Sequence, residues 1–471
     1  MATRTNGNGK QDHALRSLFD FETGRVSREI YVNEDIFQQE LEQIFGRCWL
    51  LLGHESQIPN PGDFVVTRMG EEEVIMVRDR KDKKIRAFLN TCVHRGMKVC
   101  RYDDGNALVF TCPFHGWSYD TDGRLVGLAF YDQAYKDNQL DKSKVKLHEV
   151  GQLCNYYGLI WATWDPKAPS FEDYLGPFAP SLRHVMMSTD GEDAGVEVFN
   201  PVIKWRLPTN WKIPAFSSST DLTHAAMTHR SVNVAAIGPQ GDVEGGNRSP
   251  LRVPFPAKKY TIGDHNLGHG GGYTAYEQPG LPEYRDTWME EGVDDYYRAA
   301  RERKAQKFAD TIMPGHGHGG GHFCVWPNVI VDSWRIRPWQ PHAPGVVERW
   351  SMYAVDKNAP KYVKDAERHY VMRYNGPSGV TESDDMENWN YVYPASLGTQ
   401  ARKLPYYFRS GIDQGFDNDR LPDVLFTHPM TEESHRARFS RWLQFMEAKS
   451  WDDLFPVRKS TKGNNPWGSK A

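Results

Sequence analysis

Long apolar segments are missing from this sequence. No run of its 471 residues approaches the roughly eighteen consecutive apolar residues that a membrane-spanning helix needs. The first twenty residues are polar and of mixed charge, without the apolar stretch of a secretory signal. These absences exclude a helical membrane protein, and we expect a cytoplasmic chain without a membrane partner.

Cysteine and unbalanced charge are also scarce. Six cysteines in so long a chain are too few for a framework of disulfide bonds. A formal net charge of -4 gives no reason to expect nucleic acid as a partner. The remaining composition, 39% hydrophobic and 25% charged residues, is that of a globular protein long enough for about two or three domains.

Two of the six cysteines lie in short loops that also carry a histidine. Cys92-Val93-His94 and Cys112-Pro113-Phe114-His115 offer two thiolates and two imidazoles. This is the donor set of a Rieske [2Fe-2S] centre, in which two histidines replace two cysteines on one iron. A Cys2His2 zinc site is the alternative, although zinc sites usually pair cysteine with cysteine. Glycine follows both histidines, at Gly96 and Gly116, and permits tight turns that expose amides to cluster sulfurs.

A second signal is the pattern D-x2-H-x4-H, formed by Asp221, His224 and His229. Two imidazoles and one carboxylate are the ligands of non-heme iron oxygenases. On an ideal helix the two histidines lie about 140° apart, so convergence on one ion requires a distortion or a helix end. We therefore predict irregular backbone between them. The carboxylate comes either from Asp221 or from the distant run Glu382-Ser383-Asp384-Asp385.

The chain changes from a β-rich part to a mixed part. Residues 33–45 have helical spacing. Strand-like runs follow at 63–67, 73–77, 85–90, 107–111 and 158–164, and both cysteine-histidine loops fall between such runs. Beyond a boundary at 165–169 follow strand-like stretches at 196–207, 323–337 and 347–355, and helical stretches at 221–230, 294–311, 361–373 and 435–448. Strands and helices without regular alternation predict an α+β fold.

Two segments rich in glycine and histidine interrupt the mixed part. We predict loops at 268–272 and 315–322, because a dinucleotide fingerprint would have to leave a strand and open a helix. A metal site at His316, His318 and His322 is the alternative, although this loop has few carboxylates.

The order and spacing of the motifs resemble the large α subunits of aromatic-ring-hydroxylating dioxygenases, Rieske non-heme iron oxygenases that include naphthalene, biphenyl and phthalate dioxygenases. The likeness covers nearly the whole chain and rests on both cysteine-histidine loops and on residues 158–166, 210–212, 221–229 and 382–389. It implies a β-rich Rieske domain at 46–165 and a larger catalytic domain at 166–471, with an antiparallel sheet flanked by helices. Residues 1–45 would be an arm and a helix that belong to the catalytic domain.

The resemblance also implies the ligands of two iron sites. In the [2Fe-2S] cluster, two cysteines would hold one iron and two histidines the other: Cys92 with Cys112, and His94 with His115. A mononuclear Fe(II) would be held by two histidines and a carboxylate: His224, His229 and Asp385. Asp385 is preferred to Asp384 because the second aspartate of this pair is the ligand in the family.

Asp221 matches an aspartate that links two subunits in the family. It would connect His115 of one subunit to the iron-bound His224 of its neighbour, so electron transfer would depend on a trimer. The resemblance further implies a small β subunit in an α3β3 assembly, and a ferredoxin and a reductase that relay electrons from NADH. The reaction would add O2 to an aromatic ring and give a cis-dihydrodiol.

The sequence departs from its relatives around the expected pocket. Many relatives carry Glu-Asn-Phe before the bridging aspartate and Tyr before the first histidine ligand, where this chain has hydroxyl-rich residues 217–220 and Thr223. The candidate pocket residues are Ser217, Ser218, Asn375 and Thr381. Because unpaired polar groups disfavour an apolar ligand, we hypothesise a substrate with a polar substituent, such as the carboxylate of a phthalate or a substituted benzoate. The alternative is that the serines only satisfy local backbone hydrogen bonds.

Two other functions remain open at this point. A Rieske monooxygenase or demethylase acting on a polar aromatic substrate would share both metal sites. An electron-transfer protein without oxygenase activity would need only the first site, and the substitutions around Ser217 give that interpretation some weight.

Overall fold

The chain divides into two compact units in the computed structural model. The small unit spans Phe45–Phe171, and the large unit combines Met1–Ile44 with Glu172–Ala471. The structure describes residues 15–135, 139–193, 195–217, 221, 223–230, 259–263, 266–274, 292–307, 323–331, 335–416, 424–428 and 430–454. Ser218 and the predicted loop at 315–322, with its three histidines, lie outside these residues. Among the described helices, none combines the length and apolar character that crossing a membrane requires.

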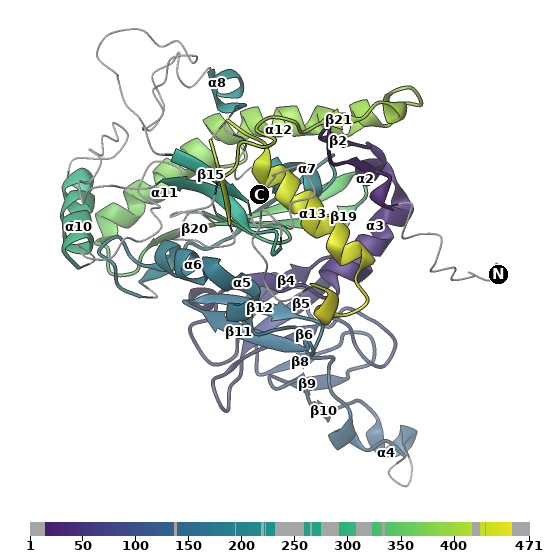
Figure 1. The fold of residues 1–471 in the computed structure, drawn as a ribbon. Coiled ribbons are helices and arrows are strands. Elements are labelled where there is room, and N and C mark those ends of the chain that lie inside the picture. Colours follow the sequence, from purple (N-terminus) through teal and green to yellow (C-terminus); the bar gives the residue numbers. More distant parts are fainter. Residues whose placement is uncertain are drawn as a thin grey trace. The chain divides into compact units, whose positions relative to one another are not determined.

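The described part of the small unit forms antiparallel sheets (Figure 1). A four-stranded sheet has the order β6 (Ile85–Leu89), β5 (Glu72–Arg78), β4 (Asp63–Met69) and β7 (Asp104–Asn106). Two three-stranded sheets have the orders β10 (Leu125–Gly127), β9 (Ser118–Asp120), β8 (Val109–Thr111), and β11 (Gln152–Tyr156), β12 (Leu159–Thr163), β3 (Leu50–His54). The strands predicted in this region are confirmed, with small differences at their ends.

Both cysteine-histidine loops connect strands of the small unit. The first lies between β6 and β7, and the second forms the hairpin between β8 and β9. Cys92 and Cys112 belong to the buried core of this unit and are only 2% and 1% exposed. The core beneath them is apolar and includes Phe64, Ile75, Val77, Phe88 and Phe110. The loops are therefore anchored through their cysteines.

A large antiparallel sheet forms the centre of the large unit. Its order is β13 (Val196–Val198), β20 (Val346–Asp356), β19 (Arg335–Ala343), β18 (Val329–Val331), β17 (Phe323–Val325), β16 (Gly270–Thr274), β15 (Lys259–Gly263) and β22 (Leu425–Thr427). β14 (Ile203–Leu207) also pairs with β20. A separate small sheet contains β1 (Phe19–Asp20), β2 (Arg25–Val26) and β21 (Tyr406–Tyr407).

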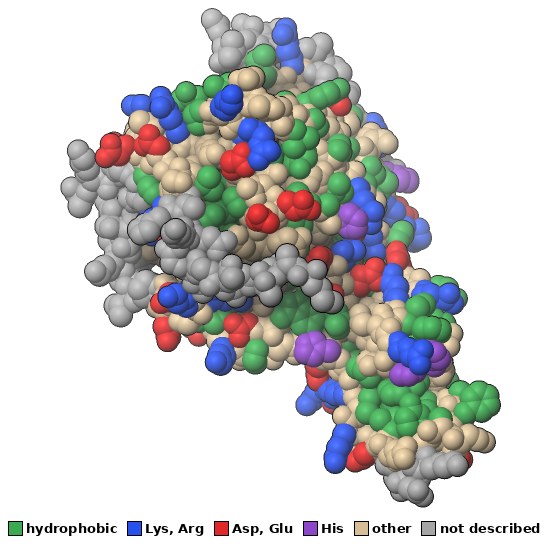
Figure 2. All heavy atoms as spheres, turned by 90° about the vertical axis from the view of Figure 1, so that its right-hand side faces the viewer, with side chains coloured by type: hydrophobic (Ala, Val, Ile, Leu, Met, Phe, Trp, Pro, Cys, Tyr) green, Lys and Arg blue, Asp and Glu red, His purple; other side chains and the backbone are tan. Residues whose placement is uncertain are grey.

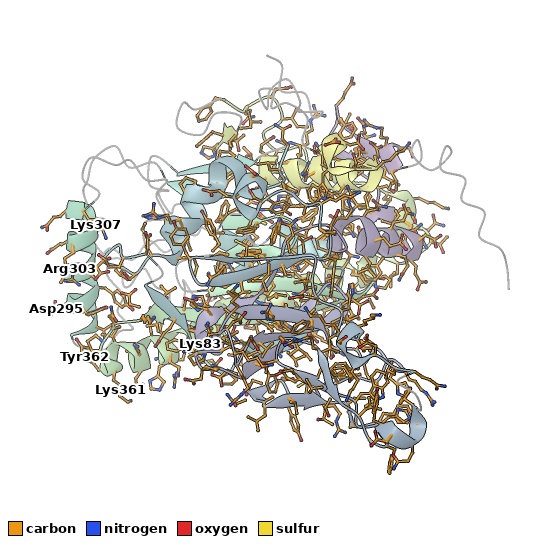
Figure 3. All side chains as sticks on the ribbon, turned by 90° about the horizontal axis from the view of Figure 1, so that it is seen from below. Lys83, Asp295, Arg303, Lys307, Lys361 and Tyr362 are labelled. Carbon is orange, nitrogen blue, oxygen red and sulfur yellow. The ribbon has the colours of Figure 1, made fainter. Side chains whose placement is uncertain are left out.

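Helices pack against this large sheet. α13 (Glu433–Glu447) contacts β15 and β16, α11 (Lys361–Asn375) contacts β20, and α12 (Val380–Val392) contacts β14. α10 (Val293–Lys307) packs on α11 and presents Asp295, Arg303 and Lys307 on its exposed side (Figure 3). The shorter helices of this unit include α2 (Glu29–Val32), α3 (Glu34–Glu40), α6 (Ala179–Met186), α7 (Lys212–Ser217) and α8 (Ala225–Thr228). The predicted α+β fold, with an antiparallel sheet flanked by helices, is confirmed.

Local predictions failed at several places in the large unit. The expected strand at 196–207 is split into β13 and β14, and Pro201, which has no N–H for a ladder, lies in the gap. The expected loop at 268–272 is wrong from Gly270 onward, because β16 pairs there with β17. The helix predicted at 221–230 shortens to the single turn of α8, and α12 was not predicted at all.

A buried ion pair joins the N-terminal helix α3 to the rest of the large unit. Lys212 Nζ lies 2.6 Å from Glu40 Oε1, and both side chains are 0% exposed. The same carboxylate accepts hydrogen bonds from Trp211 Nε1 at 2.8 Å and Trp442 Nε1 at 2.7 Å. Because a buried charge needs partners that satisfy it, this network gives Trp211 and Lys212 of the Asn210-Trp211-Lys212 motif a structural role.

Candidate metal centres

The two cysteine-histidine loops share one backbone conformation. In each loop the cysteine N–H donates to the carbonyl five residues later, at 2.8 Å in both cases. Gly96 and Gly116 donate back to the carbonyls of Cys92 and Cys112, at 2.9 and 3.0 Å. Both glycines have positive φ, 71° and 70°, a conformation that glycine adopts without strain. The shared spacing of four residues from cysteine to glycine thus encodes two equivalent turns.

Aromatic side chains surround the donors of these loops. The rings of His94 and His115 meet edge to face with centroids 4.6 Å apart, and His94 stacks on Trp117 at 4.8 Å. Nδ1 of His94 is buried without a hydrogen-bond partner. Burial, together with the charges of His115 and Arg95, lowers the pKa of His94. A neutral imidazole with an unpartnered buried nitrogen fits a metal ligand.

The arrangement of the four donors in the two loops fits a [2Fe-2S] cluster better than a single zinc ion. Among the described residues, only His224, His229 and Asp385 place three donor atoms within 4.8 Å of one another. The donors of the two loops do not converge in this way, whereas a tetrahedral Cys2His2 zinc site would require it. A cluster with two irons, one held by cysteines and one by histidines, accommodates a wider donor set.

The second group of donors lies in the large unit. Asp385 Oδ1, on α12, is 3.2 Å from His224 Nε2 and 3.4 Å from His229 Nε2. Asp384 approaches His229 from the other side, with its Oδ2 3.5 Å from Nδ1. Each histidine stands at one end of α8. The prediction of irregular backbone between them is wrong, because all four intervening residues form the helical turn α8. The imidazoles come together because each histidine lies just beyond one end of this turn.

Electrostatics at this group favour a bound cation. Burial would lower the pKa of His224, but hydrogen bonds with Asp221 and Asp385 outweigh it and raise the pKa to about 10. Burial would raise the pKa of Asp385, but the hydrogen bond with His224 and the charges of both histidines hold it below its usual value. Negative charge thus converges on the imidazoles, and a divalent metal satisfies the same charge with neutral histidines.

Asp221 lies behind His224. Its Oδ1 is 3.8 Å from His224 Nδ1 and accepts a hydrogen bond from the Thr223 hydroxyl at 2.6 Å. Although burial opposes it, hydrogen bonds with His224 and Thr223 and the charges of His435 and His224 lower the pKa of Asp221. The carboxylate is therefore ionised, and it can orient His224 from outside the donor group.

A cavity of about 320 Å³ opens beside these residues. Its polar lining residues are Ser217, Asp221, His224, Thr228, Asp385, Asn388 and His435. Much of the remaining wall is aromatic or aliphatic: Tyr31, Ile213, Phe216, Trp389, Val392, Tyr406 and Phe408. Two of the three candidate donors, His224 and Asp385, thus face a mixed, largely apolar cavity.

Comparisons with known proteins agree with this geometry. Residues 48–135 match the Rieske [2Fe-2S] domain. The chain is 36% identical to the benzene 1,2-dioxygenase subunit alpha of Pseudomonas putida, over 94% of this chain and 96% of the relative. It is 35% identical to the biphenyl dioxygenase subunit alpha of Paraburkholderia xenovorans, over 94% and 95%. This chain belongs to the aromatic-ring-hydroxylating dioxygenase α subunits.

A solved structure supports the same assignment. Naphthalene 1,2-dioxygenase from Rhodococcus sp., bound to indole, superposes on this α subunit with a TM-score of 0.79 and 30% identity, covering 94% of this chain and 99% of the other. The predicted family and fold class are confirmed.

Of the four pocket residues predicted for this α subunit, the three that the structure describes do not all line the cavity. Ser217 lines the cavity. Asn375 and Thr381 are buried, at 2% and 8% exposure, and are not among its lining residues. Asn375 ends α11, where its side chain accepts a hydrogen bond from Arg335 and its carbonyl accepts one from the Tyr353 hydroxyl at 2.6 Å.

Sequence reasoning missed several residues of these sites. His435, on α13, lines the cavity, and its Nδ1 is buried without a hydrogen-bond partner. Asn388 and Tyr31 also line it. In the small unit, the Tyr119 hydroxyl lies 3.1 Å from Cys92 Sγ. Of these residues, only Tyr119 could have been proposed from the sequence, because it lies two residues after Trp117, in the strand that follows the second cysteine-histidine loop.

If Cys92 ligates the cluster as predicted, the hydrogen bond between Tyr119 and Cys92 should affect the cluster. A hydrogen bond to a cluster sulfur stabilises the additional negative charge of the reduced state. We expect Tyr119→Phe to lower the midpoint potential by tens of millivolts, because part of a charged hydrogen bond of about 1.5–3 kcal/mol is lost. Potentiometric titration measures this shift. Tyr102→Phe, at a 72% exposed tyrosine of the same unit, is the control, and an equal shift there would contradict the assignment.

Proposed function

We propose that this chain is the catalytic subunit of a multicomponent dioxygenase that adds both atoms of O2 to an aromatic ring, giving a cis-dihydrodiol. The observation that carries the proposal is the coexistence of two different donor sets in one chain. The paired loops of the small unit suit a [2Fe-2S] cluster, and His224, His229 and Asp385 suit a mononuclear Fe(II). When bound, these groups supply electron transfer and dioxygen activation.

The residues of the small unit would hold the cluster in the family pattern. Cys92 and Cys112 would hold one iron, and His94 and His115 the other. The residue before each histidine leaves apolar surface exposed, with Val93 at 47% and Phe114 at 58%. Figure 2 shows hydrophobic side chains of this kind on the surface of the small unit. Such a surface suits contact with another protein chain.

Electrons would enter the large unit through Asp221. Its ionised carboxylate lines the cavity and contacts His224, so it can accept a hydrogen bond from an imidazole N–H that arrives from outside. We assign that imidazole to His115 of a neighbouring subunit in an α3β3 assembly with a small β subunit. Separate ferredoxin and reductase proteins would deliver electrons from NADH.

We propose an aromatic substrate with a polar substituent, such as a carboxylate. The polar groups that the cavity offers to such a substituent include the hydroxyls of Ser217 and Thr228 and the amide of Asn388. The competing candidates are the unsubstituted hydrocarbons for which the relatives are named, benzene, biphenyl and naphthalene.

The assignment of Asp221 predicts a separation of two properties. Asp221→Ala should leave the Rieske absorbance spectrum unchanged, because Asp221 is not a cluster ligand. Substrate oxidation coupled to electron supply should fall about 10–100-fold, as expected when the partner of a ligating histidine is lost. Asp295→Ala, at an exposed aspartate of α10, controls for the loss of a carboxylate. Wild-type coupled turnover in Asp221→Ala would refute the role of Asp221.

Labelled oxygen and a substrate panel test the reaction itself. With ¹⁸O2, we expect two labelled atoms in each product, whereas a monooxygenase or demethylase would introduce one. The panel compares benzene and naphthalene with benzoate and phthalates. Faster turnover of the carboxylates supports the polar substrate. Preference for an unsubstituted hydrocarbon would reject it and leave the dioxygenase assignment intact.

A further inference from the structure

Arg349 is a fully buried cation on a strand of the large sheet. It lies on β20, and its side chain is 0% exposed. Its guanidinium carbon is 4.7 Å from the ring centroid of Trp205 on β14 and 4.8 Å from that of Trp339 on β19. Its Nε donates to the Ser351 hydroxyl at 3.2 Å. Burying a guanidinium is costly unless its charge is paired. The acidic partner of Arg349 therefore indicates what the arginine does in the fold.

The partner of Arg349 is Glu382, in the first turn of α12. The two side chains form an ion pair, and the carboxylate side chain is only 3% exposed. Glu382 precedes Asp385 by three residues, so the two carboxylates lie on neighbouring positions of the same helix face. A constraint on Glu382 therefore acts on Asp385 through a single turn of helix.

The two tryptophans that enclose Arg349 also hold α12. Trp205 Nε1 lies 2.8 Å from the sulfur of Met386, the residue after Asp385. The Trp339 ring meets the Trp389 ring edge to face at 5.3 Å and 88°. Arg349, Trp205 and Trp339 thus form one continuous contact surface beneath the turns of α12 that carry Asp385.

We propose that Arg349 is a positioning residue for the mononuclear metal site. Its ion pair with Glu382 fixes the rotation of α12 on the sheet and thereby holds Asp385 Oδ1 at 3.2 and 3.4 Å from the two histidine nitrogens. The histidines flank the single turn of α8, whereas α12 is a thirteen-residue helix anchored at several points. The carboxylate side of the site is therefore the side that the fold can hold rigidly. This inference rests on the proposed function.

Fe(II) affinity in the full chain tests this role. Glu382→Gln keeps the volume of the side chain and removes the charge, and Arg349→Lys keeps the charge and removes the planar fork. Both variants, stripped of mononuclear iron, are titrated anaerobically with Fe(II) in equilibrium dialysis, well below their unfolding temperatures. We expect about 10–100-fold weaker Fe(II) binding with unchanged Rieske absorbance, which reports an intact small unit. If Arg349→Lys does not fold, Glu382→Gln carries the test.

Glu348→Gln is the matched control. Glu348 pairs with Arg206 at 2.9 Å across the neighbouring strands β14 and β20, and that arginine side chain is 55% exposed. This control should bind Fe(II) as the wild type does. If Glu382→Gln only lowers the unfolding temperature and binds Fe(II) like the control, Arg349 is merely structural and the inference fails. If wild-type protein binds no Fe(II) beyond its cluster, the proposed function fails, and the inference fails with it.

Discussion

The constraint on which the large unit depends is the approach of one carboxylate oxygen to two imidazoles. Asp385 Oδ1 lies within 3.4 Å of the Nε2 atoms of both His224 and His229. Three ionisable groups this close need a shared cation, either a proton or a metal, because desolvated charges without partners are costly. The short helix α8, the long helix α12 and the buried Arg349 beneath it are arranged so that the three donors meet.

In the small unit, the candidate metal ligands are positioned by local turns. Its donors come in two loops with the same hydrogen-bonding pattern and the same positive φ at Gly96 and Gly116. Each loop carries its cysteine into the core and leaves its histidine near the surface. Local turns therefore suffice for the proposed cluster site, whereas the proposed mononuclear site requires segments that are far apart in the chain.

This difference explains what could be predicted from the sequence. The cysteine-histidine loops and the strands around them were predictable, because ligand spacing, glycine and residue alternation are local signals. Helix α12 was not, because its buried face carries polar residues in place of an apolar stripe: Thr381 and Glu382 are buried beside Trp389. Residues 268–272 were expected to form a loop, yet a strand begins at Gly270 because its neighbour β17 supplies partners that the local sequence does not reveal.

Nonlocal contacts likewise hid much of the cavity. Tyr31 and His435 come from opposite ends of the chain, and Arg349 stands in an ordinary strand pattern. The individual ligand roles, and the pocket roles of Ser217, Ser218, Asn375 and Thr381, remain predictions. The most direct test of the central claim is the iron content per chain of purified wild-type protein and of His224→Ala. We expect about three irons in the wild type and about two, with an unchanged Rieske spectrum, in the variant. About two irons in both proteins would refute the mononuclear iron site.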